Sequence, residues 1–292
     1  MKYLALLFFL VLLSPLAGCG SVEQPARSGA REPTPLATAG RLTPVIASSE
    51  LTVGRNRFTL GLLRENTPVE DATVHLRFFK IEGDTATLTE EADAPYYGYG
   101  LQGKGVYVAH PTFDRPGDWG VEVQARLPDG ATQILRSRFT VQAEGRVPRV
   151  GEQAPSVPTP TEAQVADLKT ITSDPQPDPR LYQISLDQAL AQGRPVALIF
   201  ATPGYCSSAV CGPDLDVIKQ LADTYGGRIA FIHVEVYKDP LNRVLADPMV
   251  AWNLETEPWL FLIDKQGIIR ARYEGGITRQ EVEPDVRRLL GE

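Results

Sequence analysis

Apolar and polar residues alternate in short runs over the first half of the chain. The runs lie between residues 43 and 143, at 57–62, 72–78, 106–108, 119–127 and 134–141. A period of two is typical of strands that bury one face. Turn sequences rich in Pro, Gly and Asp separate the runs, as at 115–118 and 128–130. Five to seven short strands at this spacing predict an all-β sandwich over residues 43–143.

The pattern changes beyond residue 182, where helical and strand periods alternate. A continuous apolar run at 196–200 predicts a strand that is covered on both faces. Further strands are predicted at 229–236, 259–263 and 268–273, the last two as a hairpin. Apolar residues at helical spacing predict a helix over 215–225 that ends at a Gly-Gly pair. This order predicts an α/β fold over residues 161–292.

Capping-box sequences mark the expected starts of three helices in this second region. They begin at Thr161, Ser185 and Thr278, each followed three residues later by Gln or Glu. Gly193 suits the position just beyond a helix end. Pro284 is expected to distort or delay the last helix, because proline lacks the N–H that a helix interior needs.

The N-terminus follows the three-part pattern of an export signal. Lys2 precedes an apolar stretch at 3–13, which is too short to span a bilayer as a helix. Residues 16–19, Leu-Ala-Gly-Cys, resemble the bacterial lipobox. This resemblance implies a lipoprotein signal peptide at 1–18 and a lipid on the sulfur of Cys19. We therefore expect an extracytoplasmic protein, anchored to the lipid membrane of a bacterial cell envelope through acylated Cys19. An ordinary signal peptide with an incidental cysteine is the alternative.

Two segments have the composition of linkers. Residues 19–42 are rich in Ser, Ala, Pro, Gly and charge, which predicts a flexible tether. Residues 144–160 contain four prolines, which interrupt both helices and strand ladders. The chain is therefore expected to hold two domains, at 43–143 and 161–292.

Charge and cysteine content limit the kinds of partner and site that this chain can have. The net charge of −7 argues against a nucleic-acid partner. The three histidines are scattered along the chain, so no multi-ligand metal site and no cofactor are expected. Apart from Cys19, the only cysteines are Cys206 and Cys211, which can form a disulfide in an exported protein.

The two cysteines lie between a predicted buried strand and a predicted helix. A thiol at a helix N-terminus has a lowered pKa, and a second thiol nearby can resolve a mixed disulfide. Residues five apart in a regular helix have Cα atoms roughly 8.6 Å apart, beyond the ~7 Å limit for a disulfide. We therefore expect Cys206 in the loop or at the helix cap, with Ser207 or Ser208 capping. Residues 212–213, Gly-Pro, should then start or kink the helix.

The cysteine segment at 200–213 and Pro258, which stands just before a strand, resemble the thioredoxin-like superfamily, in particular exported TlpA-like proteins. The resemblance implies a cis proline at 258 that faces the cysteines. It also implies thiol–disulfide exchange on exported protein thiols, with Cys206 attacking, Cys211 resolving and Pro258 shaping substrate contact. The cysteine pair would also need a redox partner, whose identity the sequence does not give. Four residues separate the cysteines where the family has two, and Tyr205 and Glu257 replace its common residues.

The first domain resembles the YtkA-like, immunoglobulin-like domains of exported bacterial proteins. The resemblance rests on the layout of residues 54–63, 68–79 and 105–125. Some relatives of that kind are linked to copper. In this region His75 and His110 are the only soft ligands, so strand packing or exposure is the expected state of both.

Two alternatives to exchange remain open. One is a redox-silent binding module with a structural disulfide, although closing so short a loop gains only about 2 kcal/mol. The other is a peroxiredoxin-like thiol peroxidase, for which Thr202 stands one residue too far from Cys206. His233 and Glu235 are candidates for proton relay or for satisfied strand positions. The three tryptophans are expected to pack in the core.

Overall fold

The computed structural model describes residues 40–292 with the exception of residue 102. The expected signal peptide at 1–18, Cys19 and most of the expected tether at 19–42 lie outside these described residues. The first described strand, β1, begins at Leu42.

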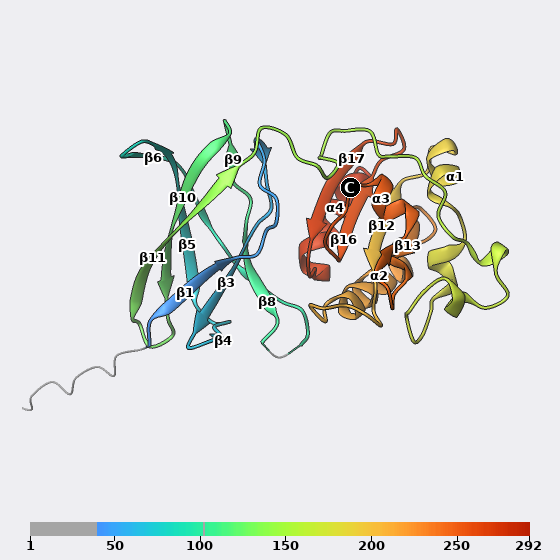
Figure 1. Ribbon diagram of the computed structural model, residues 1–292, viewed down its shortest axis with the longest axis horizontal. Helices are drawn as coiled ribbons and strands as arrows, with labels where there is room; N and C mark the ends of the chain where they lie inside the picture. Colours follow the sequence, from blue (N-terminus) through green and yellow to red (C-terminus); the bar gives the residue numbers. More distant parts are fainter. Residues whose placement is uncertain (1–39, 102) are drawn as a thin grey trace, which may run out of the picture. The chain divides into compact units, whose positions relative to one another are not determined.

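Antiparallel strands form the first domain (Figure 1). One sheet has the order β11-β10-β5-β6, with β5 at Thr73–Glu82, β6 at Thr85–Asp93, β10 at Gly117–Arg126 and β11 at Thr132–Val141. The second sheet has the order β1-β3-β8-β7, and β4 also pairs with β3. Its strands are β1 (Leu42–Ile46), β3 (Phe58–Arg64), β4 (Thr67–Pro68), β7 (Tyr96–Gly98) and β8 (Gly105–Ala109). Short β2 (Gly54–Arg55) and β9 (Thr112–Phe113) pair with each other.

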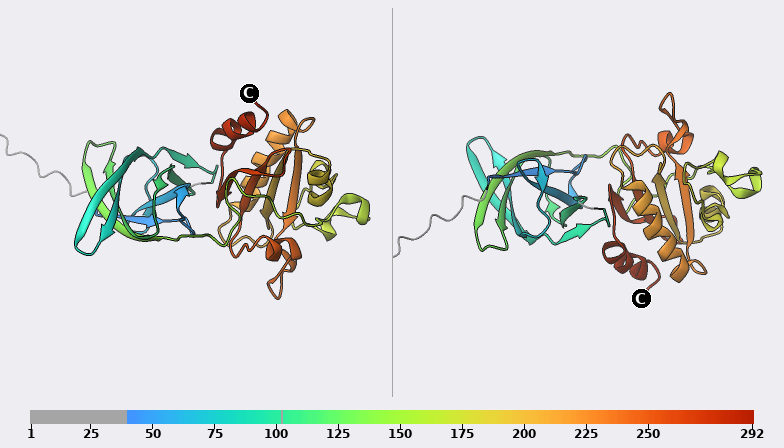
Figure 2. Two further views of the ribbon diagram at one scale, coloured as in Figure 1. Left: turned by 90° about the horizontal axis from the view of Figure 1, so that it is seen from above. Right: turned by 90° about the horizontal axis from the view of Figure 1, so that it is seen from below.

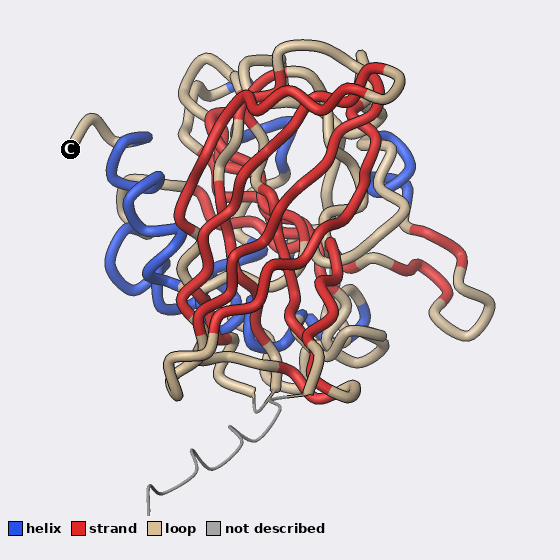
Figure 3. The backbone as a smooth tube through the Cα atoms, turned by 90° about the vertical axis from the view of Figure 1, so that its left-hand side faces the viewer, coloured by secondary structure: helices blue, strands red, loops and turns tan. Residues whose placement is uncertain are grey.

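The alternation in the sequence explains which side chains fill this domain. Along β5 every second residue is buried, and Val74, Leu76 and Phe78 are among them. Phe58 and Phe78 meet edge to face at 5.1 Å between ring centroids, and Trp119 packs on Phe113 at 4.8 Å. Figure 3 shows the strands of the domain running side by side. The predicted all-β sandwich is confirmed at the level of its strands and core.

The strand β6 is absent from the sequence prediction. Most of its residues are exposed, so no apolar alternation marks it. It forms because its backbone pairs with β5 at the edge of the sheet, from His75 opposite Asp93 to Glu82 opposite Thr85.

A mixed sheet of order β13-β12-β16-β17 forms the centre of the second domain. Its strands are β12 (Val196–Ala201), β13 (Ala230–Glu235), β16 (Trp259–Ile263) and β17 (Ile269–Glu274), close to the four predicted ranges. β12 and β13 are parallel, and the other pairs are antiparallel. All six residues of β12 are buried, as its continuous apolar run predicts. A small hairpin of β14 (Tyr237–Asp239) and β15 (Val244–Leu245) follows β13.

Helices cover both faces of this sheet (Figure 2). On one face Ala197 and Ile199 pack with residues of α2 (Cys211–Tyr225) and α4 (Arg279–Leu289). On the other face Leu198 and Phe200 pack with residues of α1 (Leu186–Ala191) and α3 (Asp247–Ala251). Three 3-10 helices precede α1, at Glu162–Gln164, Leu168–Thr170 and Pro179–Tyr182. Trp252 and Trp259 are buried among these residues, as expected.

One local prediction in this domain is wrong, and one of the two effects expected of Pro284 is absent. Ser185 precedes α1, but its hydroxyl accepts a hydrogen bond from Thr159 N at 2.8 Å and forms no side-chain cap. The helix α4 is not delayed by Pro284, because Thr278 caps it through a 3.2 Å bond from Glu281 N. Pro284 therefore lies inside α4, where its missing N–H leaves one helical hydrogen bond unformed.

Candidate functional site

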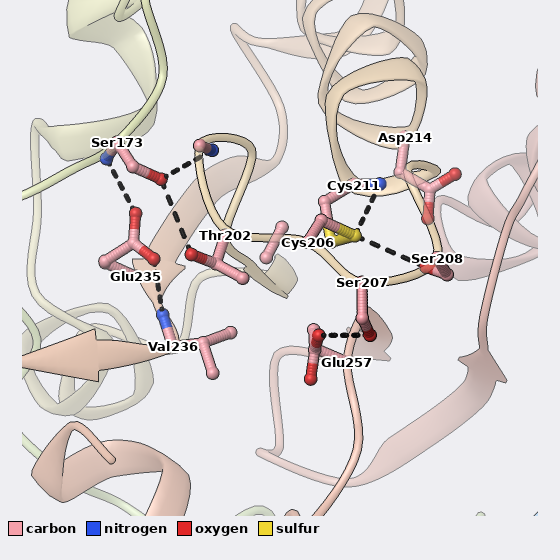
Figure 4. Close-up of a disulfide and its surroundings, with 12 residues drawn as sticks. Ser173, Thr202, Cys206, Ser207, Ser208, Cys211, Asp214, Glu235, Val236 and Glu257 are labelled. Carbon is pink, nitrogen blue, oxygen red and sulfur yellow. Dashed lines mark hydrogen bonds between the residues drawn. A yellow bond between two sulfur atoms is a disulfide. The ribbon is translucent and has the colours of Figure 1, made fainter. Parts of the chain in front are cut away.

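Cys206 and Cys211 form a disulfide between the loop after β12 and the first residue of α2 (Figure 4). Their Cα atoms are 6.1 Å apart, which is possible because Cys206 lies outside the helix. The expected placement of Cys206 is therefore confirmed, and residues 212–213 lie in the first turn of α2. Cys211 is fully buried, whereas Cys206 is partly exposed and neighbouring Tyr205 is 50% exposed.

The expectation that Ser207 or Ser208 caps α2 is wrong. The residue before the helix is Val210, and no side chain caps its N-terminus. Ala209 adopts the left-handed backbone conformation, with φ of 64°, and this turn separates the two serines from the helix. Their hydroxyls have other partners: Ser208 Oγ lies 3.3 Å from Cys206 Sγ, and Ser207 Oγ donates to Glu257 Oε1 at 3.4 Å.

The sulfur of Cys206 is placed to carry negative charge once the disulfide is reduced. The backbone N–H of Cys211 points at Cys206 Sγ over 3.4 Å, and the Ser208 hydroxyl lies beside the same sulfur. The N–H group belongs to the N-terminus of a 15-residue helix, whose dipole favours an anion there. The two cysteines are therefore unlike: Cys206 is partly exposed and has two donors at its sulfur, whereas Cys211 is buried.

A serine from a distant segment holds the loop that carries Cys206. Gly204 N donates to Ser173 Oγ at 3.0 Å, and Ser173 N donates to Glu235 Oε2 at 2.7 Å. A Cβ atom on Gly204 would lie 2.9 Å from Ser173 Cβ, so only glycine allows this close approach. No local pattern in the sequence marks Ser173 for this role, because its partner Gly204 is 31 residues away.

His233 is a satisfied core residue at the end of the neighbouring strand. Its Nε2 lies 2.9 Å from the carbonyl oxygen of Ala201, so Nε2 carries the proton. Its Nδ1 accepts a hydrogen bond from the Tyr182 hydroxyl at 2.6 Å. Burial lowers the pKa of His233, which keeps the ring neutral in this network. The network fixes the end of β12, just before the cysteine loop.

Pro258 follows a cis peptide bond and is buried at the start of β16. The preceding residue, Glu257, accepts the hydrogen bond from Ser207, so this segment lies against the cysteine loop. The Pro258 carbonyl accepts a 2.9 Å hydrogen bond from Gly275 N. The disulfide joins Cys206 to Cys211, and the bond from Ser207 to Glu257 places the residue before Pro258 beside the loop that carries Cys206.

The two histidines of the first domain take part in different local contacts. His75 Nδ1 lies 2.8 Å from Asp93 Oδ1 on the neighbouring strand, at the surface. Burial, followed by the charge of Arg55, lowers the pKa of His110. Within residues 40–292 apart from 102, no group of three or more His, Cys, Asp or Glu side chains is arranged to hold a metal ion. In the same part of the chain, no helix has the length and apolar character needed to cross a membrane.

Asp214 is a buried carboxyl close to the disulfide. Its burial is not predicted from the sequence. Asp214 lies on α2 three residues after Cys211 and is 1% exposed (Figure 4). Its Oδ1 accepts a hydrogen bond from Ile277 N at 2.9 Å. Burial raises the pKa of Asp214 well above its usual range. An acidic residue in the first turn of a helix normally predicts a solvated partner of the dipole, so no pattern marks this one as buried.

Comparison with protein-family models gives a match to the first part of the chain. Residues 37–124 match a family model described as YtkA-like, which covers the sandwich strands up to β10. No match is found among curated proteins.

Several solved structures are similar to part of this chain. A Chlorobium tepidum protein described as a candidate thiol:disulfide interchange protein DsbE is 16% identical, with a TM-score of 0.36, over 49% of this chain and 99% of that one. A thioredoxin family thiol:disulfide interchange protein of Chlorobium tepidum is 18% identical, with a TM-score of 0.34, over 51% and 100%. The soluble domain of PmoD from a Methylocystis species is 13% identical, with a TM-score of 0.24, over 34% and 88%. The division into two domains rests on the strand topology described above.

Proposed function

We propose that this chain is an extracytoplasmic, membrane-anchored thiol–disulfide oxidoreductase that acts on exported protein thiols through Cys206 and Cys211. The observation that carries the proposal is the asymmetry of the pair. Cys206 is partly exposed, with the Cys211 N–H and the Ser208 hydroxyl at its sulfur, while Cys211 is fully buried. An accessible sulfur with a stabilised thiolate is what the attacking member of such a pair requires.

Each turn of the exchange moves two electrons. The Cys206 thiolate attacks one sulfur of a client disulfide, forms a mixed disulfide and releases the other client sulfur as a thiolate, which takes up a proton. Cys211 then loses its proton and attacks Cys206 Sγ. This second step forms the Cys206–Cys211 disulfide and releases the second client thiolate. The client is reduced and the pair is oxidised, and the same steps in reverse oxidise a client dithiol.

The surroundings of the pair supply the contact with a client. Glu257, the residue before Pro258, is hydrogen-bonded to Ser207 of the cysteine loop, and Tyr205 is exposed next to Cys206. In this proposal Pro258 shapes the surface that receives the client, as in the thioredoxin-like, TlpA-like domains that the sequence resembles. The order of elements from α1 to α4 supports that assignment: helix, β12, helix, β13, helix, a β16–β17 hairpin and a final helix.

The location belongs to the same proposal. The export pattern at 1–18 and the lipobox-like residues 16–19 support a lipoprotein that is anchored through acylated Cys19. An oxidising compartment outside the cytoplasm is where a disulfide couple of this kind works.

Serine variants of the two cysteines test the exchange reaction. All chains carry Cys19→Ser, so that only the pair can react, and the probe is a synthetic peptide with one disulfide. Cys206→Ser is expected to abolish exchange with the peptide. Cys211→Ser is expected to accumulate a covalent mixed disulfide, because the attack proceeds and its resolution does not. Mass spectrometry of the non-reduced protein detects that species.

Two other outcomes would decide against exchange. Activity in both variants equal to that of the parent chain would support a redox-silent binding module. Loss of hydrogen peroxide consumption in Cys206→Ser, without any peptide exchange in the parent chain, would support a thiol peroxidase.

A further inference from the structure

A buried ion pair connects the sandwich domain to the helix-bearing domain. Both domains belong to one unit, residues 40–292. Arg57, immediately before β3, donates from Nε to Glu281 Oε1 at 2.6 Å and from Nη2 to Glu281 Oε2 at 2.9 Å. Glu281 lies in the first turn of α4, and the two side chains are only 7% and 3% exposed. A bidentate pair of this kind fixes both the position and the orientation of the two side chains relative to each other.

The same guanidinium also holds the segment that follows β17. Arg57 Nη1 donates to the carbonyl of Glu274 at 2.6 Å, and Nη2 donates to the carbonyl of Gly276 at 3.0 Å. Tyr99 of the sandwich covers Gly276 so closely that a Cβ atom there would meet its ring. Two residues of the sandwich therefore hold the backbone at 274–276.

The next residue of this segment contacts Asp214. Ile277 N donates to Asp214 Oδ1 at 2.9 Å, and Asp214 lies one helical turn after Cys211. Residues three apart on a helix are neighbours on one face. A continuous set of contacts thus leads from Arg57 through Gly276 and Ile277 to Asp214 and the buried cysteine.

The charges along this path affect a thiolate at the pair. Asp214 and Glu281 are two buried carboxyls, and the positive charge of Arg57 acts on both. Without Arg57, Glu281 would be left without its buried cation, and the potential near Cys211 would become more negative. A negative potential disfavours a thiolate, and with it the reduced form of the pair.

We propose that Arg57 of the sandwich domain is a positioning residue for the redox pair, which acts through the 274–277 segment and Asp214 and favours the dithiol over the disulfide. The inference rests on the proposed function, since it assigns the sandwich a role in setting the dithiol–disulfide equilibrium of that same pair. It concerns the equilibrium between dithiol and disulfide, which is measured without any client protein.

The test measures the reduction equilibrium of the pair in redox buffers of glutathione and of dithiothreitol. The protein is the chain with Cys19→Ser. Arg57→Gln is expected to lower the equilibrium constant for reduction about tenfold, which equals about 30 mV for a two-electron couple. Arg57→Lys keeps the positive charge but not the planar guanidinium that donates two hydrogen bonds to Glu281. A smaller decrease of the equilibrium constant, about threefold, is expected for this variant. Arg55→Gln, an exposed arginine two residues earlier, is the matched control and should leave the constant unchanged.

A double-mutant cycle with Asp214→Asn tests the route. The shift caused by Arg57→Gln should shrink to less than about threefold in the Asp214→Asn background. Equal constants for Arg57→Gln and Arg55→Gln would overturn the proposal, and so would a full shift that persists in the Asp214→Asn chain. If urea titrations show that Arg57→Gln does not fold, the Arg57→Lys variant is used in its place. An unchanged equilibrium constant for reduction in Arg57→Lys would then overturn the inference. Failure of peptide exchange in the parent chain would count against the proposed function and leave this equilibrium measurable.

Discussion

At the scale of single residues, the balance between burial and charge is clearest at Asp214. Removing a carboxylate from water costs free energy unless a cation or several hydrogen bonds replace the solvent. Asp214 accepts a hydrogen bond from Ile277 N, while the guanidinium of Arg57 makes its direct contacts with Glu281 and two carbonyls. Burial therefore raises the pKa of Asp214, and the folded chain keeps this proton to a higher pH than the unfolded chain.

The variant Asp214→Asn is expected to be more stable than the parent chain at pH 7, by about 1 kcal/mol. Between the unfolded and folded pKa values of Asp214 the folded state binds more protons, so its stability falls as pH rises through that window. Asparagine lacks this penalty and retains an oxygen for Ile277 N. Urea unfolding of the oxidised protein from pH 3 to 8 should show the difference grow with pH.

The matched control is Asp216→Asn on the same helix. The Asp216 side chain is 69% exposed, so its removal should leave the pH dependence of stability unchanged. A less stable Asp214→Asn protein at pH 7 would contradict the burial argument.

At the scale of elements, α4 shows how a cap overrides a helix breaker. Thr278 fixes the start of the helix, and apolar Val282 and Val286 pack on the sheet on either side of Pro284. The helix therefore continues through the proline, although one backbone hydrogen bond is lost. Packing of an amphipathic face supplies most helical stability in proteins, and that gain exceeds the local cost here.

Replacing Pro284 with alanine is expected to raise the free energy of unfolding by about 2 kcal/mol. The change restores an N–H for the carbonyl one turn earlier, and a greater entropy of the unfolded chain offsets part of the gain. Thermal and urea unfolding measure the effect.

Pro248→Ala provides the comparison. That proline lies in the first turn of α3, where a helix has no intrahelical partner for the N–H group, so no gain is expected. Equal effects of the two substitutions would show that the helix interior does not penalise Pro284.

At the scale of the whole molecule, the proposal places two folded domains and a lipid anchor on one chain. The sandwich contacts the second domain through buried and polar groups, such as Arg57 with Glu281 and the Ser49 N–H with Glu274 Oε2 at 2.9 Å. The proposed anchor, Cys19, lies outside the described residues. In this proposal the three cysteines have two tasks: Cys19 attaches the chain to the membrane, and Cys206 and Cys211 carry out the exchange.

The variant Cys19→Ser is expected to move the protein from the membrane fraction to the soluble fraction. Acyl chains on Cys19 supply the membrane affinity in this proposal, and serine cannot carry them through a thioether. Fractionation of cells followed by immunodetection measures the distribution. Cys206→Ser, which removes a different cysteine, should stay with the membrane. Tight membrane association of Cys19→Ser would rule out the lipoprotein assignment.

The sequence by itself determined the features that depend on short stretches of chain. Alternation with a period of two predicted β5 and β10, and the apolar run at 196–200 predicted β12. Helix geometry, together with the expected disulfide, placed Cys206 outside α2. The sequence pattern did not predict β6, because this strand is stabilised by pairing with β5 rather than by an apolar face of its own.

Only the tertiary structure decided which distant residues surround the disulfide. Ser173 holds the cysteine loop, Ile277 contacts Asp214, and Arg57 reaches Glu281 across 224 residues of sequence. Each of these contacts pairs groups that local patterns treat as solvated, because a hydroxyl, an aspartate and an arginine are usually exposed. Whether such a group is buried depends on the partner that the fold brings to it, and a partner far along the chain leaves no periodic signal in the sequence.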